Sequence, residues 1–365
     1  METIKLKING IEVTAPKGST ILEAARLAHI EIPTLCFLKE INEIGACRVC
    51  IVELKNGKLV TSCVYPAEDG MEVFTNTPKV MDSRKKTIQL LLSNHNRSCL
   101  SCVRSGHCEL QELARELGVE DEGYYDGETT PSEIDTSAAH MIRDNSKCIL
   151  CRRCVAVCSE VQGIGVIGAN NRGFATEIGS AFGMGLGETS CVSCGQCIAV
   201  CPTGALQEKD CTSEVFAAIA DPSKHVIVQT APAVRAALGE EFGLPIGTNV
   251  EGKMAAALRR LGFDRVFDTD FSADLTIMEE AHEFLDRVKN GGVLPMITSC
   301  SPGWVKYCEH YFPDMTENLS TCKSPQQMFG AIAKSYYAEK MGIDPKDIVS
   351  VSVMPCTAKK FEIGR

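Results

Sequence analysis

Twenty cysteines give this 365-residue chain its most distinctive chemistry. Most of them lie in the first part of the chain, where they recur as C-x-x-C groups. Thiolates are soft ligands that suit zinc and iron-sulfur clusters, and C-x-x-C groups in a chain without an export signal favour metal over disulfides. Cys211, Cys308 and Cys322 have no partners at ligand spacing and are interpreted as packing thiols. The spacing therefore predicts a series of metal centres, followed by a region of different chemistry.

The strongest pattern is C-x2-C-x2-C-x3-C, which occurs twice and is followed by proline the second time. Bacterial ferredoxins use this run to hold two [4Fe-4S] clusters, and the fourth cysteine of each run ligates the other cluster. The first predicted cluster is held by Cys148, Cys151, Cys154 and Cys201. The second is held by Cys191, Cys194, Cys197 and Cys158.

An earlier group has the spacing C-x10-C-x2-C-x12-C and consists of Cys36, Cys47, Cys50 and Cys63. Residues 3–14 predict a hairpin around Asn9-Gly10, and Asn56-Gly57 predicts a second one. Thr20 and Glu23 predict a capping box at the start of a helix. A loop that crosses a small sheet with four thiolates suits a [2Fe-2S] cluster, and a structural zinc ion is the alternative with the same ligands.

A further group combines one imidazole with three thiolates at the spacing H-x3-C-x2-C-x5-C. Its members are His95, Cys99, Cys102 and Cys108. Together they make a complete four-ligand set for a [4Fe-4S] cluster. Helices are predicted on both sides, over 79–93 and over 108–118, where Gly118 ends the second. His107 lies outside the spacing and is interpreted as structural.

The pattern changes to alternating strands and helices from residue 225 onward. Strands are predicted at 225–230, 265–269, 293–298 and 348–354, and helices at 234–242, 252–261 and 273–289, with two more before the last strand. This order predicts a mainly parallel sheet with helices on both faces and a site at the carboxyl ends of the strands. The strand ends carry Ala231-Pro232, Asp268–Asp270, residues 298–302 and residues 354–356. No glycine-rich phosphate-binding motif interrupts this region.

Two of these strand ends resemble signature motifs of the [FeFe]-hydrogenase family. They are T-S-C-S-P-G-W at 298–304 and M-P-C-T-A-K-K-F-E at 354–362, which resemble the first two of three motifs in that family. The upstream cysteine groups resemble those of the same family and of the large iron-sulfur subunit of respiratory NADH dehydrogenase. The resemblance covers residues 1–365 and implies reversible formation of H2 from protons and electrons. The implied cofactor is an H-cluster, a [4Fe-4S] cube linked to a two-iron unit that carries CO, cyanide and a dithiolate.

The resemblance implies roles for the residues around this cofactor. Cys356 would ligate the cube, Lys359 would hold a cyanide by a charge-assisted hydrogen bond, and Met354 would pack beside the outer iron. Ala231 and Pro232 match the loop whose backbone faces the other cyanide.

The resemblance also implies a proton relay to the surface. Cys300 matches the proton-donating thiol, and Glu280, Ser320 and Glu283 match the rest of the relay. One departure is Ser301, which stands where the family has a cube ligand. Either Cys300 becomes the cube ligand and Ser301 a weaker proton carrier, or the cube is altered. A second departure is the end at Arg365, before the family's third motif and its two cube ligands, which predicts a truncated sequence.

The predicted fold class is α+β with several domains. We expect a β-grasp [2Fe-2S] ferredoxin-like domain at 1–78, a His-ligated [4Fe-4S] domain at 79–125, a bacterial ferredoxin-like domain with two [4Fe-4S] clusters at 138–212, and the N-terminal lobe alone of an α/β H-cluster domain at 222–365. Residues 120–137 are acidic and glycine-bearing, and they predict a surface loop or linker.

Composition limits the partners. The net charge of -10 and the absence of a basic run longer than Arg84-Lys85-Lys86 argue against nucleic acid. No signal peptide or membrane span is apparent, so a cytoplasmic protein is expected. The resemblance implies ferredoxin or NADH-oxidising flavoprotein subunits as electron partners, possibly in a hetero-oligomer. The alternatives are an electron-transfer subunit related to the NADH dehydrogenase protein, or a sensory or degenerate hydrogenase.

Overall fold

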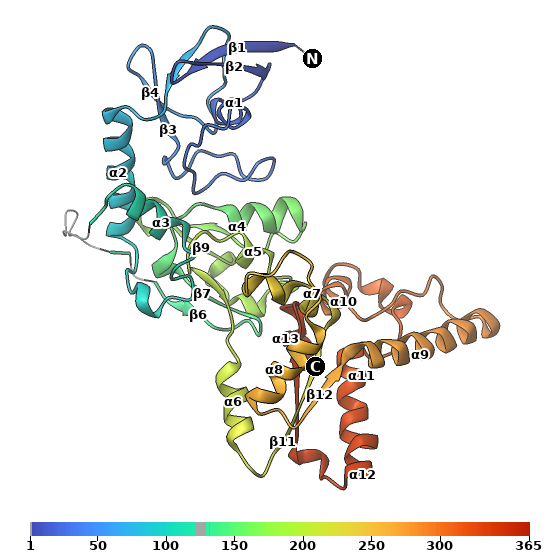
Figure 1. Cartoon of the computed structure of the whole chain (residues 1–365). Coiled ribbons are helices and arrows are strands. Elements are labelled where there is room, and N and C mark those ends of the chain that lie inside the picture. The colour runs from blue at the N-terminus through green and yellow to red at the C-terminus, as the bar shows by residue number, and fades with distance from the viewer. Residues whose placement is uncertain (1, 121–128, 131) are drawn as a thin grey trace. The chain divides into compact units, whose positions relative to one another are not determined.

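The computed structural model describes residues 2–120, 129–130 and 132–365. Its internal contacts divide the chain into two compact units. Figure 1 colours the chain by residue number, from blue at the N-terminus to red at the C-terminus. The first unit consists of Met1–Cys191 and Gln196–Glu208, and the second of Val192–Gly195 and Lys209–Arg365. Four residues of the second ferredoxin-type cysteine run are therefore grouped with the C-terminal unit.

A five-stranded mixed sheet in the order β2-β1-β5-β3-β4 opens the first unit. Both predicted hairpins are confirmed, because β1 pairs antiparallel with β2 and β3 pairs antiparallel with β4. The predicted capping box is also confirmed, since Thr20 and Glu23 cap the start of α1 through both of its hydrogen bonds. The elements are β1 (Thr3–Ile8), β2 (Ile11–Pro16), α1 (Ile21–Leu27), β3 (Ile51–Leu54), β4 (Leu59–Thr61) and β5 (Glu72–Phe74). The three residues of β5 are too few to give a periodic signal in the sequence.

Two longer helices and several short elements complete the first unit. The predicted helices before and after the His-Cys group are confirmed as α2 (Pro78–Ser93) and α3 (Glu109–Glu116). The short elements are β6 (Ile134–Asp135), β7 (Met141–Asp144), α4 (Arg153–Ala156), a π-helix (Val157–Val161), β8 (Gly168–Asn170), β9 (Glu177–Gly179), α5 (Gln196–Ala199) and β10 (Leu206–Glu208). Strand β6 lies inside the predicted linker. Residues 121–128 and 131, and with them the predicted domain end at residue 125, lie outside the described residues.

A three-stranded parallel sheet in the order β12-β11-β13 forms the centre of the second unit (Figure 1). Val226 and Val228 of β11 pack on one face with residues of α8, while Ile227 packs on the other face with residues of α11 and α12. This alternation is what a strand covered on both sides by helices requires. The prediction of a parallel sheet with helices on both faces is thus confirmed for these three strands.

The helices and strands of the second unit are α6 (Thr212–Ala220), β11 (His225–Thr230), α7 (Pro232–Glu241), α8 (Glu251–Leu261), β12 (Arg265–Asp268), α9 (Thr269–Asn290), α10 (Pro302–Tyr311), α11 (Pro325–Ile332), α12 (Ala338–Met341), β13 (Ile348–Val353) and α13 (Ala358–Glu362). The strands β11, β12 and β13 and the helices α7, α8 and α9 lie close to the predicted ranges, whereas α6 and α13 were not predicted. Among the described residues, no helix combines the length and apolar character that a membrane crossing needs.

The predicted buried strand over residues 293–298 is wrong. Only Ile297 makes a sheet-like bridge, to Leu319, and Val293 is 42% exposed. Pro295 has no N–H to donate to a neighbouring strand, which disfavours a central strand at this point. The segment is instead a loop that a side-chain hydrogen bond holds in place, since Asn318 Nδ2 donates to Pro295 O at 2.8 Å. The first motif therefore begins on a loop.

Candidate metal centres and catalytic site

The four cysteines of the predicted [2Fe-2S] group lie together in the interior of the first unit. Their exposed fractions are 5% or less. Shared hydrogen bonds with Cys47 and Cys63 lower the pKa of Cys36, and the bond to Cys36 raises the pKa of the other two. Ser62 Oγ donates to the Cys50 carbonyl at 2.8 Å. This bond links the segment that carries Cys63 to the segment that carries Cys50. A compact, desolvated group of four thiols is a suitable donor set for an iron-sulfur cluster.

The His-Cys group follows α2, and its imidazole, that of His95, is suited to bind metal. Burial, and next the charge of Lys147, lower the pKa of His95, so its ring stays neutral, which is the form that binds metal. Nδ1 of His95 is buried and has no hydrogen-bond partner among the described residues. Burial raises the pKa of Cys108. A Cβ built on Gly204 would lie 2.6 Å from Cys102 Sγ, so only glycine leaves room for that thiol.

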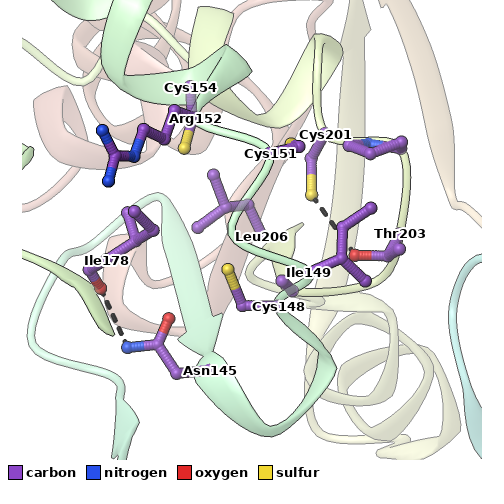
Figure 2. A pocket seen from close by; sticks show the side chains of 12 residues that line it. Asn145, Cys148, Ile149, Cys151, Arg152, Cys154, Ile178, Cys201, Thr203 and Leu206 are labelled. Carbon is purple, nitrogen blue, oxygen red and sulfur yellow. Dashed lines mark hydrogen bonds between the residues drawn. The ribbon is translucent and has the colours of Figure 1, made fainter. Parts of the chain in front are cut away.

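Cys148, Cys151, Cys154 and Cys201 line one cavity, together with Ile178 and Leu206 among others (Figure 2). Burial raises the pKa of Cys148 to about 11 and that of Cys151 to about 12. Such thiols keep their protons until a metal displaces them. The cavity contains the four residues that the ferredoxin spacing predicts for one cluster, although Cys201 comes from the other run.

The remaining ferredoxin-type cysteines are divided between the two units, because Cys194 belongs to the second. Cys158, Cys191 and Cys197 are half-buried against one apolar cluster of the first unit. In the described part of the chain, no three or more His, Cys, Asp or Glu side chains converge on the position of a single metal ion. The ligand set of this cluster, like the ligand sets of the other clusters, therefore stays a prediction.

Hydrogen bonds link the cysteine-bearing segments of the first unit to one another. Asn42, which follows the first cysteine of the [2Fe-2S] group, donates from Nδ2 to Cys151 O at 3.0 Å. The Glu109 backbone N–H donates to Pro202 O at 3.1 Å. Arg153 forms a two-pronged ion pair with Glu109, with distances of 2.7 and 3.0 Å. These contacts fix the first three cysteine groups within one body.

The parallel sheet brings three of the four predicted strand ends to one edge. Ala231 N donates to Val353 O at 3.0 Å, which places the ends of β11 and β13 side by side. Arg235, on the helix after Ala231, pairs with Asp268 at 2.5 Å and Asp270 at 2.6 Å beyond β12. This ion-pair group was not predicted. The fourth predicted strand end does not belong to the sheet.

The two signature-like motifs meet through Lys359. Its ammonium donates to Cys300 O at 3.1 Å, although Cys300 lies 59 residues earlier in the sequence, and to Glu362 Oε2 at 2.9 Å. Gln326 Nε2 also donates to Glu362 Oε2, at 2.8 Å. An ammonium has three donors, and these contacts use two of them. Cys300 and Cys356 are both exposed, Met354 is half-buried and Ser301 is exposed.

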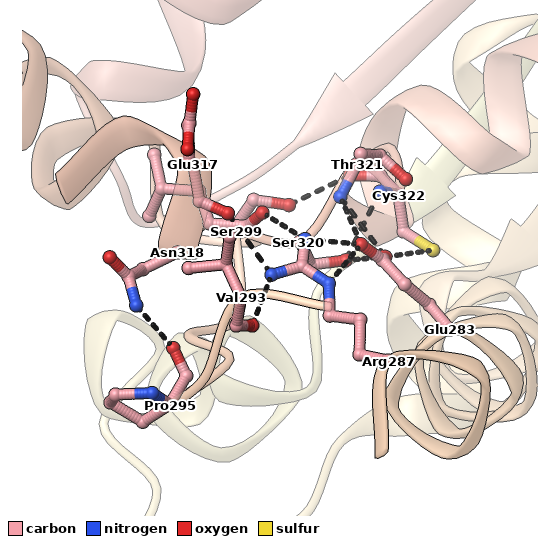
Figure 3. A network of polar contacts seen from close by, with 11 residues as sticks. Glu283, Arg287, Val293, Pro295, Ser299, Glu317, Asn318, Ser320, Thr321 and Cys322 are labelled. Atoms are coloured by element: carbon pink, nitrogen blue, oxygen red, sulfur yellow. Dashed lines mark hydrogen bonds and ion pairs between the residues drawn. The ribbon is translucent and has the colours of Figure 1, made fainter. Parts of the chain in front are cut away.

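Glu283, the outermost residue of the predicted relay, is the centre of a network of polar contacts (Figure 3). Ser320 Oγ donates to Glu283 Oε2 at 2.8 Å. Glu280, 9% exposed, has an Oε1 atom without a hydrogen-bond partner among the described residues. No hydrogen bond between described residues joins Cys300 to Glu280 or Glu280 to Ser320. The structure therefore brings together only the outer two relay residues by direct contact.

Arg287 and Cys322 are two residues of this network that the sequence analysis missed. Arg287 pairs with Glu283 and also donates to the carbonyls of Val293 and Glu317, residues that Figure 3 labels. It donates to the Leu319 carbonyl as well. Its spacing of four residues from Glu283 on α9 was an available signal. Cys322 was interpreted as a packing thiol, but its Sγ lies 3.7 Å from Glu283 Oε2.

The depressed pKa of Glu283 predicts a pH dependence. Burial opposes its ionisation, but hydrogen bonds from Ser320 and Thr321 and the charge of Arg287 outweigh burial and lower the pKa. Such a group stabilises the fold above its unfolded pKa, ~4.3 for glutamate, and this stability is lost as pH falls through the folded value. We expect the stability advantage of the parent chain over Glu283→Gln, measured by urea unfolding, to shrink below that pH. Exposed Glu279→Gln is the control, and a pH-independent advantage would contradict the assignment.

Four family models match successive parts of the chain. Residues 1–78 match "2Fe-2S iron-sulfur cluster binding domain", and residues 84–122 match "NADH-ubiquinone oxidoreductase-G iron-sulfur binding region". Residues 147–205 match "4Fe-4S dicluster domain". Residues 224–365 match "Iron only hydrogenase large subunit, C-terminal domain".

Similar proteins match large parts of the chain. NADP-reducing hydrogenase subunit HndD of Solidesulfovibrio fructosivorans is 53% identical over 377 residues, a match that covers 100% of this chain and 64% of that protein. Iron hydrogenase 1 of Clostridium pasteurianum is 43% identical, with coverage of 98% and 62%. The chain thus spans less than two thirds of the length of either relative. One chain in the crystal structure of NAD+-reducing [NiFe]-hydrogenase in the H2-reduced state matches at a TM-score of 0.53 and 31% identity, covering 57% of this chain and 88% of that one.

Proposed function

Because this chain belongs to the iron-only hydrogenase family, we propose that it catalyses reversible H2 formation as part of a hydrogenase catalytic subunit. Its first unit would carry electrons, and its second unit would supply the N-terminal lobe of the catalytic domain. Matches to three iron-sulfur binding families and to the hydrogenase C-terminal domain support this division.

The electron-carrying part would hold one [2Fe-2S] and three [4Fe-4S] clusters. The buried four-thiol group suits the [2Fe-2S] cluster, and the neutral His95 ring suits the His-ligated cluster. The cavity lined by four cysteines suits one cluster of the ferredoxin pair. The spacing of the cysteine groups is also the basis on which we assign the four domain boundaries, which are 1–78, 79–125, 138–212 and 222–365. The β-grasp description of the first domain rests on its mixed sheet and packed helix α1.

The residues around the H-cluster would bind and orient it. When bound, the cluster supplies the redox-active iron at which protons and electrons combine. Cys356 would attach the cube, and the third N–H of Lys359 would donate to a cyanide. Met354 and the Ala231-Pro232 turn would line the pocket and exclude water. The remaining cube ligands would include Cys300 or come from sequence outside residues 1–365.

The relay residues would move protons between this pocket and solvent. Cys300 would give a proton at its sulfur, and Glu280 would take it up at the oxygen that lacks a partner. Ser320 would pass it to Glu283 through the hydroxyl that already donates to that carboxylate. If Cys300 instead ligates the cube, Ser301 would take the first position as a weaker donor.

The meeting of Lys359 with the Cys300 carbonyl is the single observation that carries this proposal. It joins the two motifs at the exposed cysteines that the cofactor needs. A pure electron-transfer subunit, the second candidate, has no use for this arrangement. A sensory or degenerate hydrogenase would keep the arrangement and lose turnover, and Ser301 is the residue that motivates it.

The decisive experiment uses the gene read to its natural stop. The protein is matured with the two-iron cofactor, assayed for H2 evolution, and examined by infrared spectroscopy for CO and cyanide bands. Bands together with turnover support the proposal, and bands without turnover support the sensory alternative. A fully iron-loaded protein without bands would leave only the electron-transfer candidate.

Cys300→Ala provides a sharper expectation in the same protein. We expect H2 evolution to fall by roughly two orders of magnitude or more, the usual contribution of a positioned proton donor. EPR signals of the upstream clusters should stay unchanged, and Cys308→Ala is the control for loss of a thiol from the same unit. Unchanged turnover would remove Cys300 from the mechanism.

The electron partners are proposed from the relatives. HndD is named as a subunit of an NADP-reducing enzyme, which favours a hetero-oligomer with flavoprotein subunits that use NADH or NADPH. Ferredoxin is the alternative donor. A cytoplasmic location is proposed as well. Co-purification from native cells, followed by H2-dependent reduction of NAD+, NADP+ or ferredoxin, would distinguish the partners.

A further inference from the structure

One buried arginine lies beside the four-thiol group of the first unit without a carboxylate partner. Arg84 is in the middle of α2 and is only 5% exposed. Among the described residues no ion pair includes Arg84, and its Nε atom is buried without a hydrogen-bond partner. We propose that Arg84 is a buried positive charge that raises the reduction potential of the [2Fe-2S] cluster. This inference rests on the proposed function, which assigns that cluster to the four-thiol group.

The helix turns Arg84 toward the interior of the unit. The buried residues of α2 are Val80, Arg84 and Ile88, which are spaced four apart and therefore share one face. Val80 and Ile88 are fully buried. Ile88 packs in one apolar cluster with Cys36 and Cys47. Arg84 thus occupies a position on the buried face where an apolar side chain would be expected.

A hydrogen bond ties Arg84 to the segment that carries Cys50. Nη2 of Arg84 donates to Ile51 O at 2.7 Å, and Ile51 directly follows Cys50. Burial lowers the pKa of Arg84 to about 10, and the charge of a Cys50 thiolate opposes this effect. The guanidinium therefore stays charged at neutral pH. Since a thiol loses its proton when it binds a metal, Cys50 becomes a negative neighbour of Arg84 once the cluster is bound.

None of the nearby glutamates forms an ion pair with Arg84. It lines one cavity with four of them, Glu31, Glu109, Glu112 and Glu116. Glu109 pairs with Arg153 instead, at 2.7 Å, and the other three are exposed, so water and salt screen their charges. Buried charges are normally paired or placed at a metal site. The unpaired guanidinium therefore points to a negative group inside the first unit, which the cluster and its thiolates supply.

Reduction of the cluster increases its negative charge. One electron is added and no atom is transferred, so the cluster with its four thiolates becomes more negative by one charge. A buried positive charge stabilises this reduced form more than the oxidised form, because buried interactions are poorly screened. Net charge, hydrogen bonds and solvent exposure set the potentials of iron-sulfur clusters. Arg84 should therefore make the cluster accept an electron more readily and release it less readily.

The test is a redox titration of Arg84→Gln, which removes the charge and keeps an N–H donor for Ile51 O. The gene is read to its natural stop, and the protein is loaded with its iron-sulfur clusters but not with the two-iron unit, so hydrogen chemistry does not interfere. Dithionite reduces the protein stepwise, and EPR follows the [2Fe-2S] signal. We expect the equilibrium constant for reduction of this cluster to fall by about tenfold, which is about 59 mV for a one-electron couple. The other clusters should keep their parental potentials.

Three further variants separate the charge from a structural effect. Arg84→Lys keeps the charge and should keep a potential close to the parental one. Arg84→Met removes both the charge and the donor and should shift the potential as Arg84→Gln does. Lys85→Met removes an exposed charge from the next residue of α2 and should leave the potential unchanged. If Arg84→Met does not hold the cluster, the contrast between Arg84→Gln and Arg84→Lys decides.

The outcomes also separate this inference from the proposed function. Equal potentials in Arg84→Gln and the parent, with the signal present in both, would overturn the role of Arg84 and leave the cluster assignment standing. A shift in Arg84→Met alone would assign the effect to the hydrogen bond and would also overturn the role of the charge. An iron-loaded parent without a [2Fe-2S] signal would contradict the cluster assignment itself. A shift in Arg84→Gln together with a parental potential in Arg84→Lys supports the inference.

Discussion

Replacing Arg287 with alanine is expected to destabilise the second unit by more than the loss of an exposed ion pair, about 1 kcal/mol, and by less than the ~3–5 kcal/mol that follows from breaking a fully buried pair. Arg287 and Glu283 have side chains that are only 12% and 15% exposed, and their N···O distance is 2.6 Å. The substitution would leave the half-buried Glu283 carboxylate without its cation. It would also remove the donor to three backbone carbonyls that come from two different loops. Urea unfolding followed by circular dichroism measures the change.

Lys346→Ala is the matched control for Arg287→Ala. Lys346 pairs with Asp344 at 2.8 Å, but these side chains are 76% and 49% exposed. An exposed pair contributes about 1 kcal/mol or less. Arg287→Lys should recover part of the lost stability, because lysine restores the charge but not the fork of donors. A loss no larger than that of Lys346→Ala would show that the network contributes little to the fold.

Replacing Cys154 with alanine is expected to remove one [4Fe-4S] cluster and interrupt the electron chain. Cys154 is 8% exposed and lines the cavity with the other three cysteines. A [4Fe-4S] cluster in a ferredoxin takes four cysteine ligands, so iron content should fall by about four atoms per chain. H2 evolution driven by reduced ferredoxin should fall to a small fraction of the parental rate. Iron analysis and EPR of the purified protein measure the change.

Cys308→Ala is the control for Cys154→Ala. Its thiol is fully buried on α10 and lies 3.6 Å from Phe312 O. We expect this variant to keep its full iron content, because Cys308 belongs to none of the four-ligand groups. Full iron content in Cys154→Ala would refute the assignment of Cys154 as a ligand.

Several elements of the chain were predictable from local patterns. The hairpin at Asn9-Gly10 and the capping box at Thr20 follow from interactions between residues a few positions apart. The spacing also predicted that Cys201 joins the three cysteines of the other run, and in the structure these four line one cavity. Their role as ligands stays a prediction.

The contacts that were missed depend on distant residues. The apolar run over 293–298 looks like a strand, but Arg287 and Asn318 hold it as a loop, and no local pattern reports those contacts. Cys322 has no partner at ligand spacing, yet folding brings it to Glu283, 39 residues earlier. Thr357 Oγ1 donates to Ser193 O, although the two residues are 164 positions apart in the sequence. Such pairings are set by the tertiary fold rather than by periodicity.

The close approach of Gly204 to Cys102 limits how such chains can exchange modules during evolution. Gly204 follows the last ferredoxin-type cysteine, and Cys102 belongs to the His-Cys group, so these two segments pack directly against each other. A ferredoxin module transplanted from another protein would need glycine at this position, and a backbone course at residue 202 that places the carbonyl where it can receive the Glu109 N–H. The two segments are therefore expected to be inherited as a pair, because neither fits an arbitrary neighbour.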